Sequence, residues 1–390
     1  MWIHSRENCC SSQELDCKGW RMSQSLQSIS KAGTSIWLDD LSRERMIPGG
    51  KSRNLAELIN KDFVVGVTTN PAIFSASISQ SSLYSEDLLS LARAGHSAES
   101  IISELTTSDV AQACDLFLPV FERSNGMDGR VSIEVDPRLA RDTAGTIEQA
   151  RYLWSKVNRP NVLIKVPATL KGLPAIKTLI SEGISVNVTI IFSVQRYQDV
   201  LEAFIAGLEE RSSRGLALSS IHSVASFFVS RVDTEIDPRL KNHSDSQASS
   251  LLGKAAVANA RLAYEHFENV KSTSRWSKLE SAGGNIQRPL WASTGVKDPS
   301  YDPTMYVVDL VAPLTVNTMP EPTLNAVRDV GHFKGNTISG TYEESRRTLE
   351  KLLNLGIDIS EVADKLEREG IDKFIKPWLE LIAAVDKASR

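Results

Sequence analysis

The chain has few cysteines, and most of them lie at its beginning. Of four cysteines among 390 residues, three lie within the first 17 positions, and Cys114 alone lies further along. Disulfide frameworks are typical of small secreted domains, so this usage excludes a disulfide-stapled fold and suits a reducing cytosol. The spacing of Cys9, Cys10 and Cys17 also matches no zinc-binding pattern. We therefore expect a cytoplasmic protein.

Long apolar stretches and runs of basic residues are also missing. No segment approaches the roughly 18 apolar residues that a membrane span requires, and residues 1–21 lack the apolar core of a signal peptide. With 44 Lys and Arg against 48 Asp and Glu, the net charge is −4. A slightly acidic chain without a basic cluster has no general attraction to nucleic acid. The composition therefore predicts a globular protein that binds neither membranes nor nucleic acids.

Eight short apolar segments alternate with helical sequence from residue 34 onward. The predicted strands cover residues 35–39, 63–68, 130–135, 162–167, 185–192, 220–225, 289–293 and 312–317. A doubly wound sheet usually carries G-x-G-x-x-G after its first strand, but here that strand ends in Leu38-Asp39-Asp40. The pattern therefore predicts an α/β fold of the (β/α)8 TIM-barrel type.

Both ends of the chain fall outside this alternation. We expect residues 1–31 to be a disordered extension and residues 32–390 to form a single barrel domain. From about residue 340 the pattern predicts additional C-terminal helices, at 342–355, 360–369 and 371–388. The last of these is amphipathic, and we expect this end of the chain to cap the barrel.

Lys165 lies in the middle of the fourth predicted strand, with apolar neighbours on both sides. Burial disfavours the charged ammonium form of lysine. A neutral amine in a dry pocket is what Schiff-base formation with a carbonyl substrate requires. The alternative is a lysine that reaches solvent from the strand end, or a gatekeeper charge on an apolar strand.

Other polar residues cluster at the predicted strand ends, which is where barrels of this kind carry their catalytic groups. These residues are Asp39, Thr68, Asn70, Glu134, Asn187, Thr189 and Ser226. Any one of them could be a core polar group with satisfied hydrogen bonds. Several around one lysine favour a catalytic site, because each unpaired buried polar group costs several kcal/mol.

These residue types suit carbon–carbon bond chemistry through a Schiff base. Lys165 would attack a ketose carbonyl, while Glu134, with a water held by Thr189, would transfer the protons. Asp39 is the carboxylate left to act as base at the C4 hydroxyl. A zinc-dependent aldolase would need several histidines, but only His222 of the six falls in a predicted strand. We therefore expect neither a metal nor a cofactor.

The remaining candidates suit substrate binding. Asn70 and Asn187 would hydrogen-bond the hydroxyls of the substrate. Ser226 would open the helix after the sixth strand, where free backbone N–H groups attract phosphate. Arg231 would reach the same phosphate, although it could equally lie on a solvated helix face. Lys297, after the seventh strand, is a second candidate cation.

Six segments within residues 32–388 together carry a specific resemblance. They are Trp37-Leu-Asp39, Gly66-Val-Thr-Thr-Asn70-Pro71, Val131-Ser-Ile-Glu134, Ile164-Lys165-Val-Pro-Ala-Thr169, Ser185-Val-Asn187-Val-Thr189 and Ser223-Val-Ala-Ser226-Phe-Phe-Val-Ser-Arg231. With them, the sequence resembles the transaldolase family. It is most similar to the longer, actinobacterial-type branch, which shares the opening Trp37-Leu-Asp-Asp-Leu-Ser-Arg43 and the segment Asn317-Thr-Met-Pro320. One segment departs from the family: shorter relatives carry a second phosphate-binding arginine where this chain reads Thr294-Gly-Val-Lys297.

The resemblance implies a cofactor-free barrel of the class I aldolase type, with the Schiff-base lysine on the fourth strand. It implies a transferase of the pentose phosphate pathway. Such an enzyme moves a dihydroxyacetone unit from sedoheptulose 7-phosphate or fructose 6-phosphate to glyceraldehyde 3-phosphate or erythrose 4-phosphate. The catalytic and binding candidates above, Thr68 and Lys297 excepted, fall on active-site positions of the family. We expect small sugar phosphates as the partners, and a monomer or homodimer as the assembly.

Two alternatives remain open at this point. A fructose-6-phosphate aldolase would share the first half-reaction. The resemblance to that branch implies a tyrosine at the position where this chain has Phe228, so the phenylalanine favours transfer. A non-catalytic sugar-phosphate-binding barrel would keep Ser226 and Arg231 but would not need Asp39, Glu134 and Lys165 together.

Overall fold

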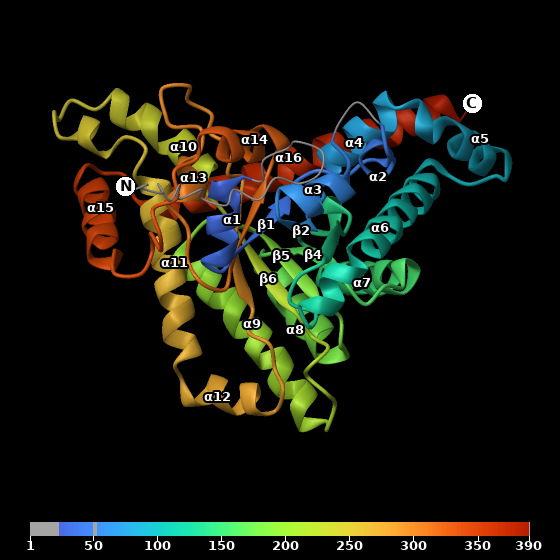
Figure 1. Ribbon diagram of the computed structural model, residues 1–390, viewed down its shortest axis with the longest axis horizontal. Helices are drawn as coiled ribbons and strands as arrows, with labels where there is room; N and C mark the ends of the chain where they lie inside the picture. The colour runs from blue at the N-terminus through green and yellow to red at the C-terminus, as the bar shows by residue number, and fades with distance from the viewer. Residues whose placement is uncertain (1–22, 50–52, 390) are drawn as a thin grey trace, which may run out of the picture.

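The computed structural model describes residues 23–49 and 53–389 (Figure 1). The cysteines at positions 9, 10 and 17 and most of the expected N-terminal extension lie outside the described residues. None of the helices in the described ranges is long and apolar enough to cross a lipid bilayer.

Eight parallel strands close into one barrel in the order of the sequence (Figure 1). Their bounds are β1 (Thr34–Leu38), β2 (Val64–Val67), β3 (Arg130–Glu134), β4 (Val162–Pro167), β5 (Val186–Ile191), β6 (Ser223–Phe228), β7 (Arg288–Ala292) and β8 (Thr315–Met319). The barrel closes where β8 pairs with β1, in a register that joins Thr34 to Thr315 and Leu38 to Met319. The predicted TIM barrel is confirmed.

Helices surround this barrel, because each buried strand is followed by a segment with one apolar face. Their bounds are α1 (Gln24–Lys31), α2 (Arg43–Met46), α3 (Leu55–Lys61), α4 (Pro71–Gln80), α5 (Ser85–Arg93), α6 (Ala98–Arg123), α7 (Thr143–Val157), α8 (Gly172–Glu182), α9 (Val194–Ser213), α10 (Ser230–Lys241), α11 (Ala255–Lys271), α12 (Ser274–Ser281), α13 (Met305–Val308), α14 (Glu321–Val330), α15 (Tyr342–Asn354) and α16 (Ile359–Ala388). Short 3-10 turns lie at η1 (Ser82–Tyr84), η2 (Pro137–Leu139) and η3 (Ala248–Leu251).

The sixth strand lies three residues further along than the sequence predicts. Ser226 is inside β6, and α10 begins only at Ser230. The strand continues because Phe227 packs edge-on against both Tyr197 and Trp291, at ring-centroid distances of 6.3 and 6.2 Å. The prediction that Ser226 opens a helix is therefore wrong.

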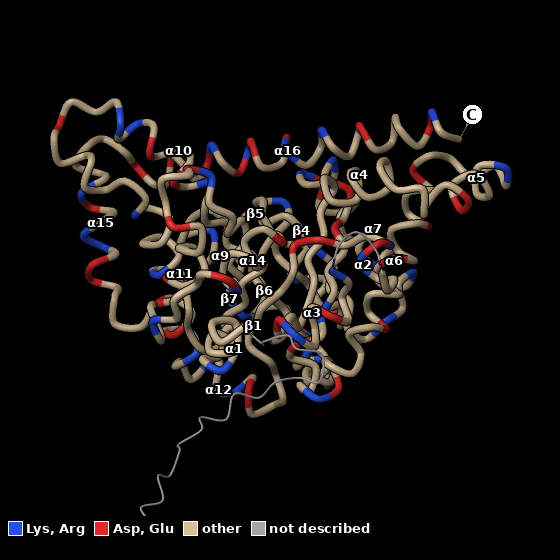
Figure 2. The backbone as a smooth tube through the Cα atoms, turned by 45° about the horizontal axis from the view of Figure 1, so that its top comes forward, with Lys and Arg blue, Asp and Glu red and all other residues tan. Residues whose placement is uncertain are grey.

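The C-terminal region also differs from its prediction, because residues 359–388 form the single helix α16. The predicted break falls at Gly370, an interior position where glycine usually weakens a helix. There α16 packs against the end of β5: a Cβ at Gly370 would lie 3.5 Å from both Ile190 and Phe192. The helix lies over one end of the barrel in both views, and the chain ends beside α5 (Figures 1 and 2).

An ordered helix precedes the first strand, so the prediction of a disordered segment 1–31 is wrong for residues 24–31. The Ser23 hydroxyl caps α1 by accepting from Leu26 N at 3.3 Å, and it donates to Arg328 O at 3.2 Å. Leu26 and Ile29 are fully buried. Two apolar residues in eight are too few to give a clear helical period, which is why the sequence did not reveal this helix.

Candidate active site

A pocket opens at the carboxyl ends of the strands, and it brings together eight of the ten predicted site residues. Its lining comprises Asp39, Thr68, Asn70, Lys165, Thr189, Ser226, Phe228, Arg231, Ala292, Ser293, Gly295, Lys297, Thr318, Pro320 and Phe374. The two predicted residues that do not line it, Glu134 and Asn187, each bond to a residue that does. The predicted site residues therefore lie together, in this pocket or directly beside it.

Lys165 is buried near the centre of this pocket, with only 5% of its surface exposed. Its Nζ donates to Thr69 O at 3.0 Å and to Glu134 Oε2 at 3.1 Å. The pairing register of β3 and β4 places Glu134 directly beside Lys165, so neighbouring strands hold the ion pair. This burial rules out the alternative of a lysine that reaches solvent.

Two buried oxygen atoms beside the lysine have no partner among the described residues, Glu134 Oε1 and Thr189 Oγ1. Buried polar atoms are usually satisfied by protein or by ordered water, so the pair suits a bound water. Burial raises the pKa of Glu134, and the Lys165 ammonium partly opposes that rise. Glu134 can therefore both accept and release protons at less acidic pH than an exposed glutamate.

A backbone irregularity directly follows Thr189. Ile190 has φ of +57°, a conformation that β-branched residues rarely adopt, and the β5–β6 register shifts between Val188 and Ile191. Bulges of this kind are common near active sites, where they redirect a side chain. Here the irregularity ends the regular alternation of side chains along β5 directly after Thr189, which lines the pocket.

Asp39, which is half-buried, is the second carboxylate of the pocket. Thr68 Oγ1 donates to Asp39 Oδ1 at 2.6 Å and lies 2.7 Å from Thr318 Oγ1. Burial raises the pKa of Asp39, while Lys165 and the Thr68 hydrogen bond lower it by less. The neighbouring Asp40 instead pairs with Arg45 at 2.6 Å. Asp39 is therefore the carboxylate of the pair that faces the pocket.

Amides and hydroxyls complete the floor of the site. Asn187 accepts from Ser226 Oγ at 2.7 Å and donates to Ser132 Oγ at 3.0 Å. Asn70 caps α4 by accepting from Ile73 N at 3.0 Å. These bonds fix the side-chain orientations before a substrate arrives, which is the preorganisation that binding requires.

The predicted phosphate cations Arg231 and Lys297 also line the pocket. Arg231 is the second residue of α10; its Nη1 is buried without a partner in the described part of the chain, and its guanidinium lies 5.3 Å from the centre of the Phe228 ring. Burial lowers the pKa of Arg231, and the carboxylates of Glu369 and Asp39 oppose this. Two cations in one pocket lining, one of them with a nitrogen free to bond, suit an anionic ligand.

Seven of the fifteen lining residues were not among the predicted site residues, and they include Ser293, Thr318 and Phe374. Thr318 follows the predicted end of the eighth strand by one residue, so a later strand end would have included it. Phe374 belongs to the amphipathic C-terminal pattern, but nothing local indicates that this face meets the barrel. In the described ranges, no group of three or more histidines, cysteines and carboxylates could hold a metal ion.

Known proteins resemble this chain over nearly its whole length. A family model described as Transaldolase/Fructose-6-phosphate aldolase matches residues 36–385. The chain is 56% identical to a transaldolase of Mycolicibacterium smegmatis over 359 residues, which is 92% of this chain and 96% of that one. It is 55% identical to transaldolase 2 of Streptomyces avermitilis, with 94% and 97% covered, and 53% identical to a transaldolase of Thermobifida fusca, with 93% and 98% covered.

Proposed function

The chain belongs to the transaldolase/fructose-6-phosphate aldolase family and has the function of a transaldolase, and we propose that it works through a Schiff base on Lys165. The observation that carries this mechanism is the buried amine of Lys165, held 3.1 Å from Glu134 in a pocket that also contains Asp39. An amine, a proton carrier and a second carboxylate are the groups that aldol cleavage of a ketose requires.

The first half-reaction begins when the neutral Lys165 amine adds to the C2 carbonyl of a ketose phosphate. Glu134, with a water bound between it and Thr189, takes one proton from the added nitrogen and passes it, together with its own proton, to the C2 oxygen, which leaves as water and gives the iminium. Asp39 takes the proton of the C4 hydroxyl, the C3–C4 bond breaks, and its electron pair moves into the iminium. The aldose phosphate leaves, and the three-carbon enamine stays on Lys165.

The second half-reaction reverses these steps with another aldose phosphate. The enamine carbon attacks the aldehyde, Asp39 returns the proton to the new C4 oxygen, and water releases the product ketose from Lys165. The enzyme would thus transfer dihydroxyacetone from sedoheptulose 7-phosphate or fructose 6-phosphate to glyceraldehyde 3-phosphate or erythrose 4-phosphate.

Two groups of residues would bind the substrate. Asn70, Asn187 and Ser226 would hydrogen-bond the hydroxyls of the dihydroxyacetone unit, beside the lysine. Arg231 and Lys297 would bind the phosphate at the other end of the substrate. Lysine offers a point charge rather than a bidentate fork, so Arg231 would carry most of the phosphate recognition.

The proposal also covers the cofactor requirement, the location and the assembly of the enzyme. The iminium itself accepts the electron pair, so the mechanism needs neither metal nor cofactor, and EDTA should leave transfer unchanged. Sugar phosphates are intracellular metabolites, so we place the enzyme in the cytoplasm, as a monomer or homodimer. Strong inhibition by EDTA would favour a metal-dependent reaction instead.

Borohydride trapping tests the mechanism. The enzyme is incubated with fructose 6-phosphate, reduced, digested and mapped by mass spectrometry, and the reduced adduct should lie on Lys165. Lys165→Met should abolish both the adduct and transfer while the melting temperature shows a folded protein. An adduct on a different lysine would overturn the assignment.

A further inference from the structure

The C-terminal helix α16 supplies part of the active site, although it belongs to none of the eight strand–helix units. It packs against α4 and α6 on one side and against α10 on the other. In both views it lies over the end of the barrel next to α4 (Figures 1 and 2). Its face toward the barrel therefore helps to determine what reaches Lys165.

Phe374 is the residue of α16 that covers the lysine. Its ring centroid lies 5.4 Å from Lys165 Nζ, and only 6% of the residue is exposed. The rings of Phe228 and Phe192, with centroids 5.2 Å apart, add apolar surface at this end of the barrel. Phe374 donates no hydrogen bond and carries no charge, so its effect at the lysine is steric and through its ring face.

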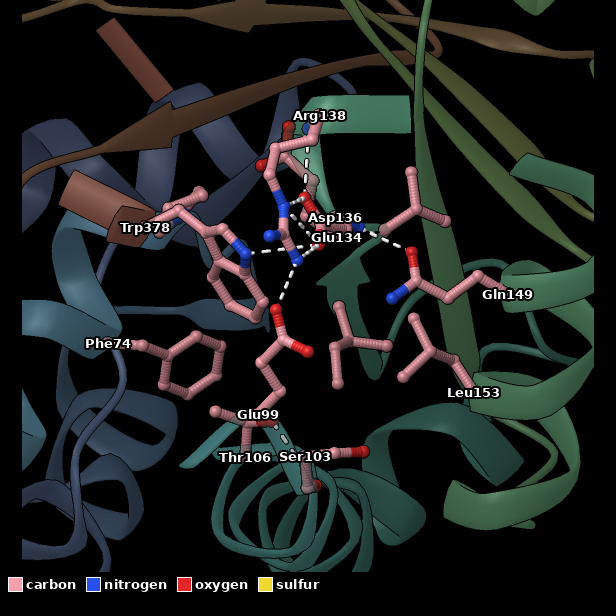
Figure 3. Close-up of a pocket in the computed structure, with 13 residues that line it drawn as sticks. Phe74, Glu99, Ser103, Thr106, Glu134, Asp136, Arg138, Gln149, Leu153 and Trp378 are labelled. Atoms are coloured by element: carbon pink, nitrogen blue, oxygen red, sulfur yellow. Dashed lines mark hydrogen bonds and ion pairs between the residues drawn. The ribbon is translucent and has the colours of Figure 1, made fainter. Parts of the chain in front are cut away.

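Trp378, one helical turn after Phe374, fastens α16 to the loop that follows Glu134. Its Nε1–H donates to Asp136 Oδ2 at 3.1 Å, and Asp136 is two residues from Glu134 (Figure 3). Arg138 donates to the same carboxylate, with Nε 2.9 Å from Oδ2, and to Glu99 at 2.6 Å. With Gly370 packed one turn earlier against the end of β5, α16 is fixed on both sides of Phe374.

We propose that Phe374 is a specificity-determining residue, which keeps water from the Lys165-bound intermediate, and that Trp378 is the positioning residue that holds it in place. The inference rests on the proposed Schiff-base mechanism. A transferase must keep the three-carbon enamine intact between departure of the first aldose and arrival of the second. Covering the lysine with an apolar ring removes the space in which a competing water would lie.

The competing reaction is hydrolysis of the intermediate. A proton adds to the enamine carbon and restores the iminium, water adds to C2 with loss of a proton, and the C–N bond breaks. The lysine leaves as a neutral amine, and free dihydroxyacetone is released. Release of the product ketose uses the same attack of water on C2, so the side reaction differs from normal turnover only in the protonation of the enamine carbon. Its rate therefore depends on the water that reaches the intermediate before the second aldose does.

The test compares free dihydroxyacetone with the transfer product. Fructose 6-phosphate is the donor and erythrose 4-phosphate the acceptor, so that the transfer product is sedoheptulose 7-phosphate, and this product and free dihydroxyacetone are measured in one mixture. In Phe374→Ala and Phe374→Leu the ratio of release to transfer should rise, by about tenfold for the alanine. Trp378→Phe keeps the ring but removes the Asp136 hydrogen bond, and it should raise the ratio less. Leu379→Ala, at a 49% exposed position of the same helix, is the matched control and should leave the ratio unchanged.

Borohydride trapping on each variant separates this inference from the mechanism on which it rests. All variants should still form the Lys165 adduct, because formation of the Schiff base does not need the aromatic ring. An unchanged ratio in both Phe374 variants would overturn the inference, and so would loss of the adduct in Phe374→Leu, which retains an apolar side chain. An adduct on another lysine in the unaltered enzyme would instead overturn the mechanism.

Discussion

At the scale of single residues, the site is a set of buried charges that are only partly compensated. Lys165 and Glu134 form one ion pair, while Asp39 has the Thr68 hydroxyl but no cation within bonding distance among residues 23–49 and 53–389. Arg231 has a buried nitrogen without a partner in the described residues. Buried charges cost free energy unless they are paired, so these residues lower the stability of the fold while they serve the reaction.

The burial of Asp39 predicts a stabilising substitution with a defined pH dependence. A carboxyl whose pKa is raised on folding favours the folded state at low pH, and this contribution is lost as the pH rises through the raised pKa. Asp39→Asn removes the charge and can still accept from Thr68. We expect it to abolish transfer and to increase the free energy of unfolding at pH 8 on the order of 1 kcal/mol.

Thermal unfolding of this variant at several pH values shows whether Asp39→Asn raises or lowers the stability of the fold. The gain from Asp39→Asn should shrink as the pH falls toward about 4, where the carboxyl of the unfolded chain also becomes protonated. Asp40→Asn is the matched control: it removes a partner from the buried Arg45 and should lower the melting temperature. A lower melting temperature for Asp39→Asn at pH 8 would contradict the argument.

Phosphate recognition gives a second prediction at this scale. Arg231→Ala should raise KM for phosphorylated substrates by the value of a charge-assisted hydrogen bond, roughly 1.5–3 kcal/mol or about 10- to 150-fold. An unphosphorylated donor should be affected much less. Arg239→Ala, on the same helix but paired with Glu235, is the control. Equal losses for phosphorylated and unphosphorylated donors would make Arg231 a structural residue.

At the scale of elements, the sequence predicts what is buried more reliably than where each element ends. β4 and β5 are buried along their whole length, and their β-branched runs allow no other assignment. The boundary of β6 was wrong because an aromatic pair such as Phe227 and Phe228 fits a strand end and a helix start equally well. Only the packing against Tyr197 and Trp291 decides between them.

Local signals explain how the helical sequence between β2 and β3 is divided. Asn70 followed by Pro71 is a standard helix start, and it begins α4. The sequence after α4 is divided into η1, α5 and α6, and Gly95, whose φ is +87°, lies between α5 and α6. These boundaries follow from a cap and from a glycine, both of which are local features of the sequence.

The continuity of α16 leads to a prediction for this element. At Gly370 the added Cβ of alanine would make ordinary van der Waals contact with Ile190 and Phe192, at 3.5 Å. Because alanine favours a helix interior by about 1 kcal/mol over glycine, Gly370→Ala should raise stability toward that amount. Chemical denaturation measures the difference. A clear loss of stability would mean that residue 370 is not an interior helical position with free space beside it.

At the scale of the whole molecule, the barrel could be predicted because its unit repeats, and the candidate site because barrels of this kind gather such residues at one end. Thus Asp39, Lys165 and Arg231, which lie at or just after predicted strand ends, line one pocket. The covering of the site could not be predicted, because Phe374 lies about 200 residues along the chain from Lys165. Its place depends on how α16 packs over the closed barrel, which no local pattern encodes.

The extent of the folding unit provides the last prediction. The described fold begins at Ser23, whose side chain caps α1, and α1 buries Leu26 and Ile29. A chain that begins at Met22 should therefore keep its melting temperature and activity, whereas one that begins at Ala32 loses that buried surface. Differential scanning calorimetry distinguishes them: the shorter chain should melt more than about 4 °C lower, on the order of 1 kcal/mol or more in a protein this size. The same loss in the chain from Met22 would show that residues 1–21 contribute packing of their own.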